Sequence, residues 1–147
     1  MIKLILQVED DENDVLLLRH AMDKAGLVVP MQVARDGQQA VDYFKADGKF
    51  SNRAEFPLPG LVLLDLKLPI LPGFDVLKAI RQHSPFQPAV IILTSSEDEK
   101  DIATAYRLGA NAYVVKPNEV GKLVDVARAI KDFWIALNRP PPEVPLP

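Results

Sequence analysis

The chain has 147 residues, which is the size of one ordinary domain and leaves no room for two full ones. Its composition, 48% hydrophobic and 25% charged, is that of a soluble globular protein, and the absence of cysteine excludes disulfide scaffolds, thiol nucleophiles and cysteine-ligated metals. A net charge of -3 gives it no general attraction to nucleic acid, and no apolar run is long enough to span a bilayer. We therefore expect a cytoplasmic protein without DNA or membrane contacts.

Apolar segments of two kinds alternate along the chain. Short, nearly continuous runs rich in Val, Ile and Leu are typical of strands buried on both faces, whereas apolar residues three and four apart predict amphipathic helices. In chain order, we expect strands at residues 2–8, 31–34, 61–64, 89–93 and 112–115, each followed by a helix, at residues 13–25, 38–46, 74–82, 97–108 and 120–137. This alternation predicts a doubly wound α/β fold with a five-stranded parallel sheet, right-handed crossovers and helices on both faces.

Local signals predict where two of the helices begin or end. The first helix is followed by Gly26, a residue type that commonly caps helix C-termini. The fourth helix is expected to start from Ser95 and Ser96, with Glu99 as the second member of a capping box.

Three further segments carry expectations about packing. The last predicted helix contains the adjacent aromatic residues Phe133 and Trp134, which cannot both face the core, so one of them is expected in a contact with a second copy of the chain. The long connection 49–60 and the segment 140–147, which has five prolines in eight residues, should depart from the compact fold.

Polar residues stand where four of the predicted strands end. The first strand is followed by Glu9 and Asp10, the third by Asp65, the fourth by Thr94 and the fifth by Lys116. In open α/β sheets the ligand crevice lies beyond the carboxyl ends of the strands, so these side chains are expected to converge.

This set of side chains suits the chemistry of phosphoryl transfer. Converging carboxylates repel one another without a cation, and Mg²⁺ is the natural partner because it takes oxygen ligands and joins carboxylates to phosphate. A lysine and a threonine hydroxyl supply positive charge and a hydrogen bond for phosphoryl oxygens. Asp65 stands alone at the end of its strand, so it is the best-placed nucleophile for an aspartyl-phosphate.

Other interpretations compete with this one. The acidic residues after the first strand could be a solvated helix N-cap. A phosphohydrolase with an aspartate nucleophile would carry a second aspartate and a threonine after Asp65, but Lys67 and Pro69 stand there instead. No glycine-rich loop for a dinucleotide follows any strand. A domain of this fold that has lost its chemistry and only binds proteins is disfavoured by the complete acidic set with its threonine and lysine.

The chain resembles a response-regulator receiver domain of bacterial two-component signalling. The resemblance covers about residues 1–137 and rests on four stretches in order, at residues 4–11 (LILQVEDD), 63–69 (LLDLKLP), 92–95 (ILTS) and 109–117 (GANAYVVKP). It implies a flavodoxin-like receiver fold with strand order 2-1-3-4-5. It also implies that Asp65 accepts a phosphoryl group from a histidine on a sensor kinase.

The resemblance further implies roles for individual residues. Mg²⁺ would be bound by Asp10, Asp65 and the backbone carbonyl of Lys67, with Glu9 supporting it through water. Lys116 would hold the phosphoryl oxygens, and its bond to Pro117 is often cis in this family.

A switch is implied as well. Thr94 would move toward the phosphoryl group and Tyr113 would rotate inward behind it, which changes the face formed by the fourth helix, the fifth strand and the fifth helix. Two departures from the family pattern are Pro72 before Gly73, which alters the loop, and the lysine side chain at position 67, which borders the phosphoryl group and bears on its lifetime.

A narrower resemblance is to the small regulators paired with bacterial phytochromes. It rests on the opening stretch 9–15 (EDDENDV), the long connection 49–60 and the extended last helix. It implies a stand-alone receiver at residues 1–137, a Pro-rich tail at 138–147 with no output domain, a phytochrome-type sensor kinase as partner, and a homodimer through the region of the last helix.

Overall fold

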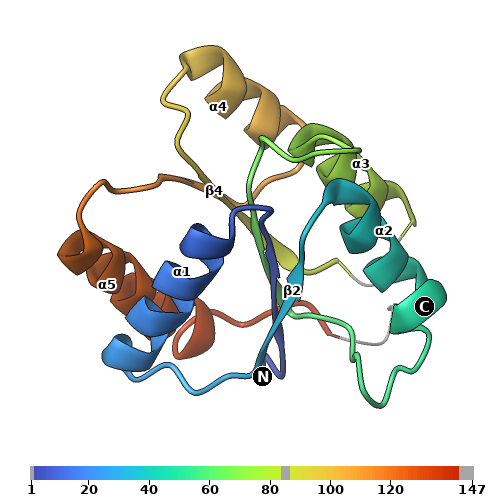
Figure 1. Ribbon diagram of the computed structural model, residues 1–147, viewed down its shortest axis with the longest axis horizontal. Helices are drawn as coiled ribbons and strands as arrows, with labels where there is room; N and C mark the ends of the chain where they lie inside the picture. Colours follow the sequence, from blue (N-terminus) through green and yellow to red (C-terminus); the bar gives the residue numbers. More distant parts are fainter. Residues whose placement is uncertain (1, 84–86, 143–147) are drawn as a thin grey trace.

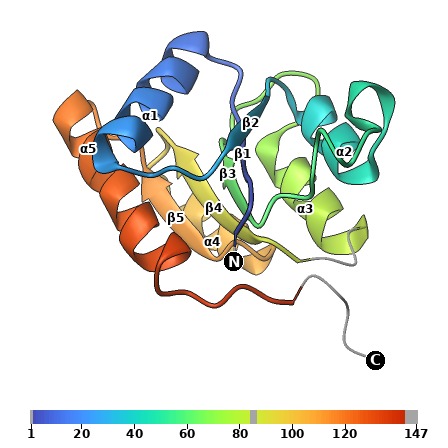
Figure 2. The ribbon, with the colours of Figure 1, turned by 90° about the horizontal axis from the view of Figure 1, so that it is seen from below.

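The computed structural model describes residues 2–83 and 87–142, which form a five-stranded parallel sheet between two layers of helices (Figures 1 and 2). The strands are β1 (Ile5–Val8), β2 (Met31–Ala34), β3 (Leu61–Leu64), β4 (Ala89–Thr94) and β5 (Ala112–Val115). They are arranged in the order β2-β1-β3-β4-β5. The predicted fold class and strand order are therefore confirmed.

The helices lie on both faces of the sheet. They are α1 (Glu12–Ala25), α2 (Gly37–Lys45), α3 (Gly73–His83), α4 (Glu99–Arg107) and α5 (Val120–Ala129), with a short 3-10 helix η1 (Gly48–Phe50) and a π-helix η2 (Ile130–Ile135). Helices α1 and α5 pack on one face, and α2, α3 and α4 cover the other (Figures 1 and 2). Among the described residues, no helix combines the length and the apolarity that crossing a membrane requires.

The strands supply apolar side chains to both layers, as expected of a parallel sheet. Successive side chains of a strand point to opposite faces. In β1, Leu6 and Val8 therefore join the core under α2 and α3, whereas Ile5 joins the core under α1 and α5. The two apolar cores cover both faces of the sheet. Polar side chains that could take part in chemistry are therefore found at the ends of the strands.

The predicted end of α1 at Gly26 is confirmed, whereas the predicted start of α4 is not. Asp11 caps α1 by accepting a hydrogen bond from Asn13 N–H at 2.8 Å, and Gly26 ends the helix with a φ of 78°. Helix α4 begins at Glu99 with Asp98 as its N-cap, so the predicted capping box is wrong. The Ser96 hydroxyl lies before the cap, where it donates a hydrogen bond to Asp101 Oδ2 and accepts one from the Asp98 N–H.

The last helix departs from the predicted apolar stripe at both ends. Val120 and Leu137 are exposed, and Phe133 is half exposed, whereas Trp134 packs into the core. The π-helix accounts for part of this difference because its wider turn rotates the following residues relative to a regular α-helix. The expectation that only one of the two adjacent aromatic residues faces inward is confirmed.

The connection between α2 and β3 is packed, contrary to the prediction. Tyr43 is fully buried and its ring lies 5.0 Å from that of Phe50 and 6.0 Å from that of Phe56. The Tyr43 hydroxyl donates to the carbonyl of Pro57 at 2.9 Å, and Arg53 donates to carbonyl groups at the end of α2. Aromatic contacts and carbonyl caps therefore hold a segment whose two prolines had indicated an open loop.

Parts of two predictions fall at the edges of the described chain. Residues 139–142 form no helix or strand and run along the edge of the sheet where the strands begin (Figure 2). Residues 143–147 of the predicted tail lie outside the described residues. So does Pro85, which follows the predicted third helix and is of a residue type that ends helices.

We expect Gly73→Ala to lower the free energy of unfolding by about 1–3 kcal/mol, because the added methyl group would sit 2.2 Å from the backbone oxygen of Asp65. Gly121→Ala is the matched control. It meets no atom within 4 Å in α5 and should stabilise the chain by about 0.5–1 kcal/mol. Urea unfolding of both variants measures the effect, and an unchanged stability of Gly73→Ala would contradict the close approach.

Candidate metal and phosphoryl site

Three carboxylates meet at the carboxyl ends of two neighbouring strands. Glu9 and Asp10 follow β1, and Asp65 follows β3, which is hydrogen-bonded to β1 in parallel register. One carboxylate oxygen from each residue lies within 4.8 Å of the others, and Glu9 and Asp65 are buried while Asp10 is exposed. The sequence prediction that these three residues converge is confirmed by this geometry.

Lys116 reaches this acidic cluster from the end of β5. Its Nζ donates to Glu9 Oε1 at 2.5 Å, to Asp65 Oδ2 at 2.9 Å and to Asp14 Oδ2 at 2.9 Å. Sequence reasoning did not include Asp14 in the site. The available signal was its position three residues after the N-cap Asp11, in the first turn of a helix that starts at the same edge of the sheet.

Burial and charge act against each other in this cluster. Burial raises the pKa of Glu9 to about 7; the hydrogen bond from Lys116 lowers it and the charge of Asp65 raises it further. Burial also lowers the pKa of Lys116, but its hydrogen bonds to the three carboxylates outweigh that effect, so its pKa lies above the ordinary value. The lysine is therefore a fixed positive charge that compensates only part of the negative charge around it.

The donor set fits Mg²⁺. Hard divalent cations take carboxylate oxygens, and the three clustered oxygens are of this type. Asp10 adds an exposed carboxylate on the solvent side, through which an ion can enter. Mg²⁺ is thus the cofactor that this acidic cluster is suited to hold, with one positive charge from Lys116 close by.

Lys67 lies next to this cluster, two residues after Asp65. Its backbone N–H points to Asp65 Oδ1 at 3.4 Å, and the residue is exposed at the mouth of the cluster. The metal-binding role of its carbonyl stays a prediction.

A buried hydroxyl and a tyrosine lie beside the cluster. Thr94 is fully buried at the end of β4, and within the described part of the chain its Oγ1 has no hydrogen-bond partner. Tyr113 of β5 is half-buried, and its hydroxyl donates to the backbone oxygen of Ser96 at 3.0 Å. Burial raises the pKa of Tyr113, so the phenol remains neutral. The described peptide bonds are all trans, so the bond from Lys116 to Pro117 does not take the cis form suggested by the resemblance.

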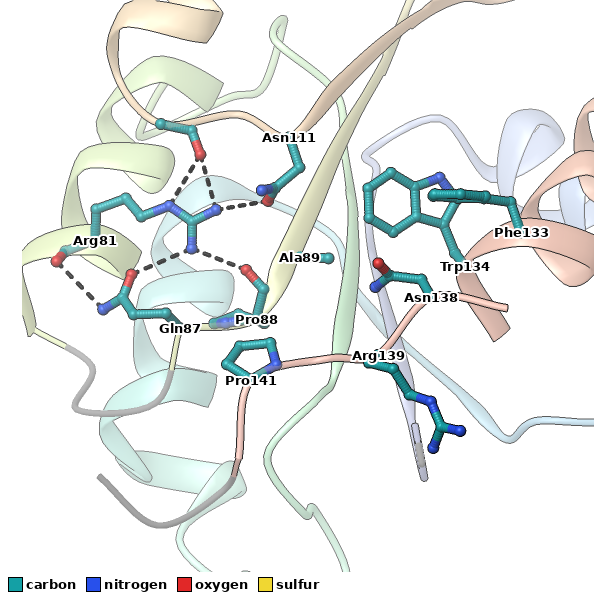
Figure 3. Close-up of a pocket in the computed structure, with 11 residues that line it drawn as sticks. Arg81, Gln87, Pro88, Ala89, Asn111, Phe133, Trp134, Asn138, Arg139 and Pro141 are labelled. Atoms are coloured by element: carbon teal, nitrogen blue, oxygen red, sulfur yellow. Dashed lines mark hydrogen bonds between the residues drawn. The ribbon is translucent and has the colours of Figure 1, made fainter. Parts of the chain in front are cut away.

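A cleft of about 480 Å³ lies at the opposite edge of the sheet, where β4 and β5 begin (Figure 3). Arg81 borders it, and every nitrogen of its guanidinium group is engaged with backbone or side-chain oxygens, including Gly109 O at 2.8 Å and Asn111 Oδ1 at 2.9 Å. Because this arginine is saturated, it ties α3 to the starts of two strands rather than offering charge to a ligand. The cleft is far from the acidic cluster in the fold and shares no residue with it.

Comparison with known proteins identifies the family. A model of the response regulator receiver domain matches residues 5–128, and the chain belongs to this family. It is a signalling domain of two-component systems, related more narrowly to the phytochrome response regulators.

Two curated relatives match this chain over most of their length. Response regulator Rcp1 of Synechocystis is 32% identical over 134 residues, covering 90% of this chain and 89% of Rcp1. The probable methanogenesis regulatory protein FilR2 of Methanothrix harundinacea is 33% identical over 139 residues, covering 94% and 87%. The relatives are therefore not all phytochrome regulators.

Two solved structures resemble this one closely. The Mn²⁺-bound form of Rcp1 has a TM-score of 0.85 at 30% identity, covering 95% of this chain and 99% of that chain. The phosphorylated cyanobacterial phytochrome response regulator RcpA has a TM-score of 0.86 at 30% identity, covering 97% and 100%.

We expect Asp10→Asn to weaken Mg²⁺ binding by at least about tenfold, because it removes the exposed carboxylate from the cluster. Asp11→Ser is the matched control, since it removes a neighbouring charge but keeps a good N-cap for α1. Calorimetric titration with Mg²⁺ measures both. Equal Mg²⁺ affinity in Asp10→Asn and the unmodified chain would show that Asp10 is not a ligand.

Proposed function

We propose that this chain is a response regulator that accepts a phosphoryl group on Asp65 from a sensor histidine kinase in a Mg²⁺-dependent reaction. The observation that carries the proposal is the environment of the Asp65 carboxylate. One of its oxygens is 2.9 Å from the Lys116 ammonium, and the residue shares a compact acidic cluster with Glu9 and Asp10.

The chemistry follows from the positions of these groups. An Asp65 oxygen forms the new P–O bond while the P–N bond to the donor histidine breaks, and the histidine nitrogen leaves with that electron pair. Asp10, Asp65 and the carbonyl of Lys67, with Glu9 nearby, would hold Mg²⁺, which would supply positive charge to the phosphoryl oxygens. Lys116 supplies a further positive charge to the phosphoryl oxygens, and Thr94 supplies a hydroxyl donor.

The proposed output is a change of surface. The Thr94 hydroxyl has no partner among the described residues, so a phosphoryl oxygen on Asp65 would give it one. Movement of Thr94 frees space behind it, and Tyr113 exchanges its hydrogen bond to Ser96 for an inward position. These two shifts would alter the face formed by α4, β5 and α5, which is where a partner would read the state of Asp65.

The proposed partner is a sensor histidine kinase of the phytochrome type. The similarity to Rcp1 and RcpA supports this choice, and the family supports a signalling role without turnover of a substrate of its own. We assign the receiver unit to residues 1–137 and place it in the cytoplasm, where such kinases carry their phosphohistidine. DNA is not among the proposed partners, since the net charge is -3.

We also propose that two copies associate through the region of the last helix. Phe133 is 50% exposed and Leu137 is 70% exposed, and both lie on or just beyond the π-helix. Large apolar side chains exposed next to one another favour association, because burying them removes apolar surface from water.

Incubation with Mg²⁺ and acetyl phosphate is expected to add one phosphoryl group to the unmodified chain and none to Asp65→Asn, because the amide oxygen is a poor nucleophile. Intact mass measures the addition, with omission of Mg²⁺ as a second negative. Asp75→Asn, an exposed carboxylate on α3, is the matched control and should react normally. A phosphoryl group on the Asp65→Asn chain would contradict the assignment.

Phe133→Asp is expected to weaken self-association by at least about tenfold, since a charge replaces an apolar contact at the proposed interface. Sedimentation equilibrium of the full chain, with and without acetyl phosphate and Mg²⁺, measures the dimer. Leu16→Asp, an equally exposed position on α1, is the control. A monomeric unmodified chain under both conditions, or equal dimerisation of the two variants, would reject this interface.

A further inference from the structure

Asp14 makes a contact in the site that neither the sequence interpretation nor the proposed function uses. It lies in the first turn of α1, and its Oδ2 accepts a hydrogen bond from Lys116 Nζ at 2.9 Å. Its side chain is 38% exposed, whereas those of its lysine partner and of Glu9 are 18% and 4% exposed. Asp14 thus meets the lysine from the solvent side, outside the cluster formed by Glu9, Asp10 and Asp65.

The three hydrogen bonds of Lys116 differ in what happens when a cation binds. An ammonium group has three N–H donors, and all three are used, by Glu9, Asp65 and Asp14. Glu9 and Asp65 also offer oxygens to the metal-binding cluster, so a cation competes with the lysine for them. Of the three described partners of this lysine, Asp14 is the one that stands outside that competition.

The support for Asp14 is itself rigid. Its backbone N–H is bonded to the side chain of the N-cap Asp11 at 3.2 Å, and α1 packs against α5 on the same face of the sheet. A lysine side chain has large rotational freedom, and holding it costs conformational entropy. A carboxylate fixed on a helix turn lowers that cost at the moment when the phosphoryl group arrives.

We propose that Asp14 is a positioning residue, which holds Lys116 Nζ at the mouth of the site so that the two remaining N–H groups meet the phosphoryl oxygens. This inference deepens the proposed function and rests on it. The opposite effect is physically reasonable too, because a fourth carboxylate repels an anionic phosphodonor. The two effects change the rate of phosphorylation in opposite directions, so they can be separated.

Two variants at position 14 test the proposal. Asp14→Ala removes both charge and acceptor, whereas Asp14→Asn removes the charge and keeps an oxygen that accepts from the ammonium. With acetyl phosphate and Mg²⁺, we expect phosphorylation of Asp65 to slow about tenfold in Asp14→Ala and only about twofold in Asp14→Asn. Asp23→Asn, which removes an exposed charge from the same helix, should react at the unmodified rate.

A time course of intact mass measures these rates. A rate in Asp14→Ala equal to or above that of the unmodified chain would overturn the proposal in favour of charge repulsion. Equal slowing of both position-14 variants would overturn it as well, because the retained acceptor would then have no effect. Unchanged melting temperatures exclude misfolding as the cause of a lower rate.

A second readout does not depend on phosphorylation. In the Mg²⁺-loaded chain, competitive labelling of amines with acetic anhydride, quantified by peptide mass spectrometry, reports how firmly Lys116 is held. We expect its labelling relative to the exposed Lys24 to rise about fivefold or more in Asp14→Ala and much less in Asp14→Asn. Unchanged labelling in Asp14→Ala would overturn the positioning role. If labelling changes as expected but no chain is phosphorylated, the proposed function is rejected, while the finding that Asp14 holds Lys116 remains.

Discussion

The site depends on one ammonium group set among carboxylates. Lys116 Nζ is within 2.9 Å of oxygens from Glu9, Asp14 and Asp65, and two of these carboxylates are buried. Leaving buried carboxylates without a cation would be costly, because their charge is no longer solvated by water. A single lysine compensates one charge of several, so the cluster remains negative and suited to a divalent cation. The same residual charge favours the binding of a cation beside Asp65, the proposed phosphoacceptor.

The sheet places these groups together and separates them from the parts that stabilise the fold. The acidic cluster and Lys116 lie beyond the carboxyl ends of the strands. At the opposite edge, the guanidinium of Arg81 is fully hydrogen-bonded, burial lowers its pKa, and the aromatic cluster around Tyr43 closes the connection to β3. The acidic cluster therefore lies at one end of the molecule, and the hydrogen-bonded Arg81 and the packed aromatic cluster lie at the other.

The Thr94 hydroxyl, which has no partner in the described part of the chain, links the site to the proposed switch. A buried donor without a partner costs about 1–3 kcal/mol of free energy. A state in which this donor has an acceptor no longer carries that cost. Tyr113 is attached to the Ser96 backbone by one hydrogen bond, a contact weak enough to exchange. A phosphoryl oxygen that satisfies Thr94 would therefore favour the alternative arrangement of both side chains, which is how a local change at Asp65 would reach the surface.

The amino-acid sequence by itself determined the alternation of strands and helices, the parallel sheet and the residues that follow each strand. These features depend on hydrophobic periodicity and on the rule that parallel strands end at one edge. The sequence alone could therefore place five residues together: Glu9, Asp10, Asp65, Thr94 and Lys116. The N-cap Asp11 and the C-cap Gly26 of α1 are consistent with the same local rules.

Other features were decided only by the tertiary structure. Asp14 contacts Lys116 because α1 starts and β5 ends at the same edge of the sheet, and only the fold shows that the two side chains reach each other. The connection after α2 is ordered by rings that meet across several residues, although its prolines indicated an open loop. Helix α4 begins at Glu99 because Asp98, rather than a serine, accepts from the Lys100 N–H. For Asp14 and for the rings after α2, contacts between residues that are separated in the sequence decided the outcome, and such contacts exist only once the chain has folded.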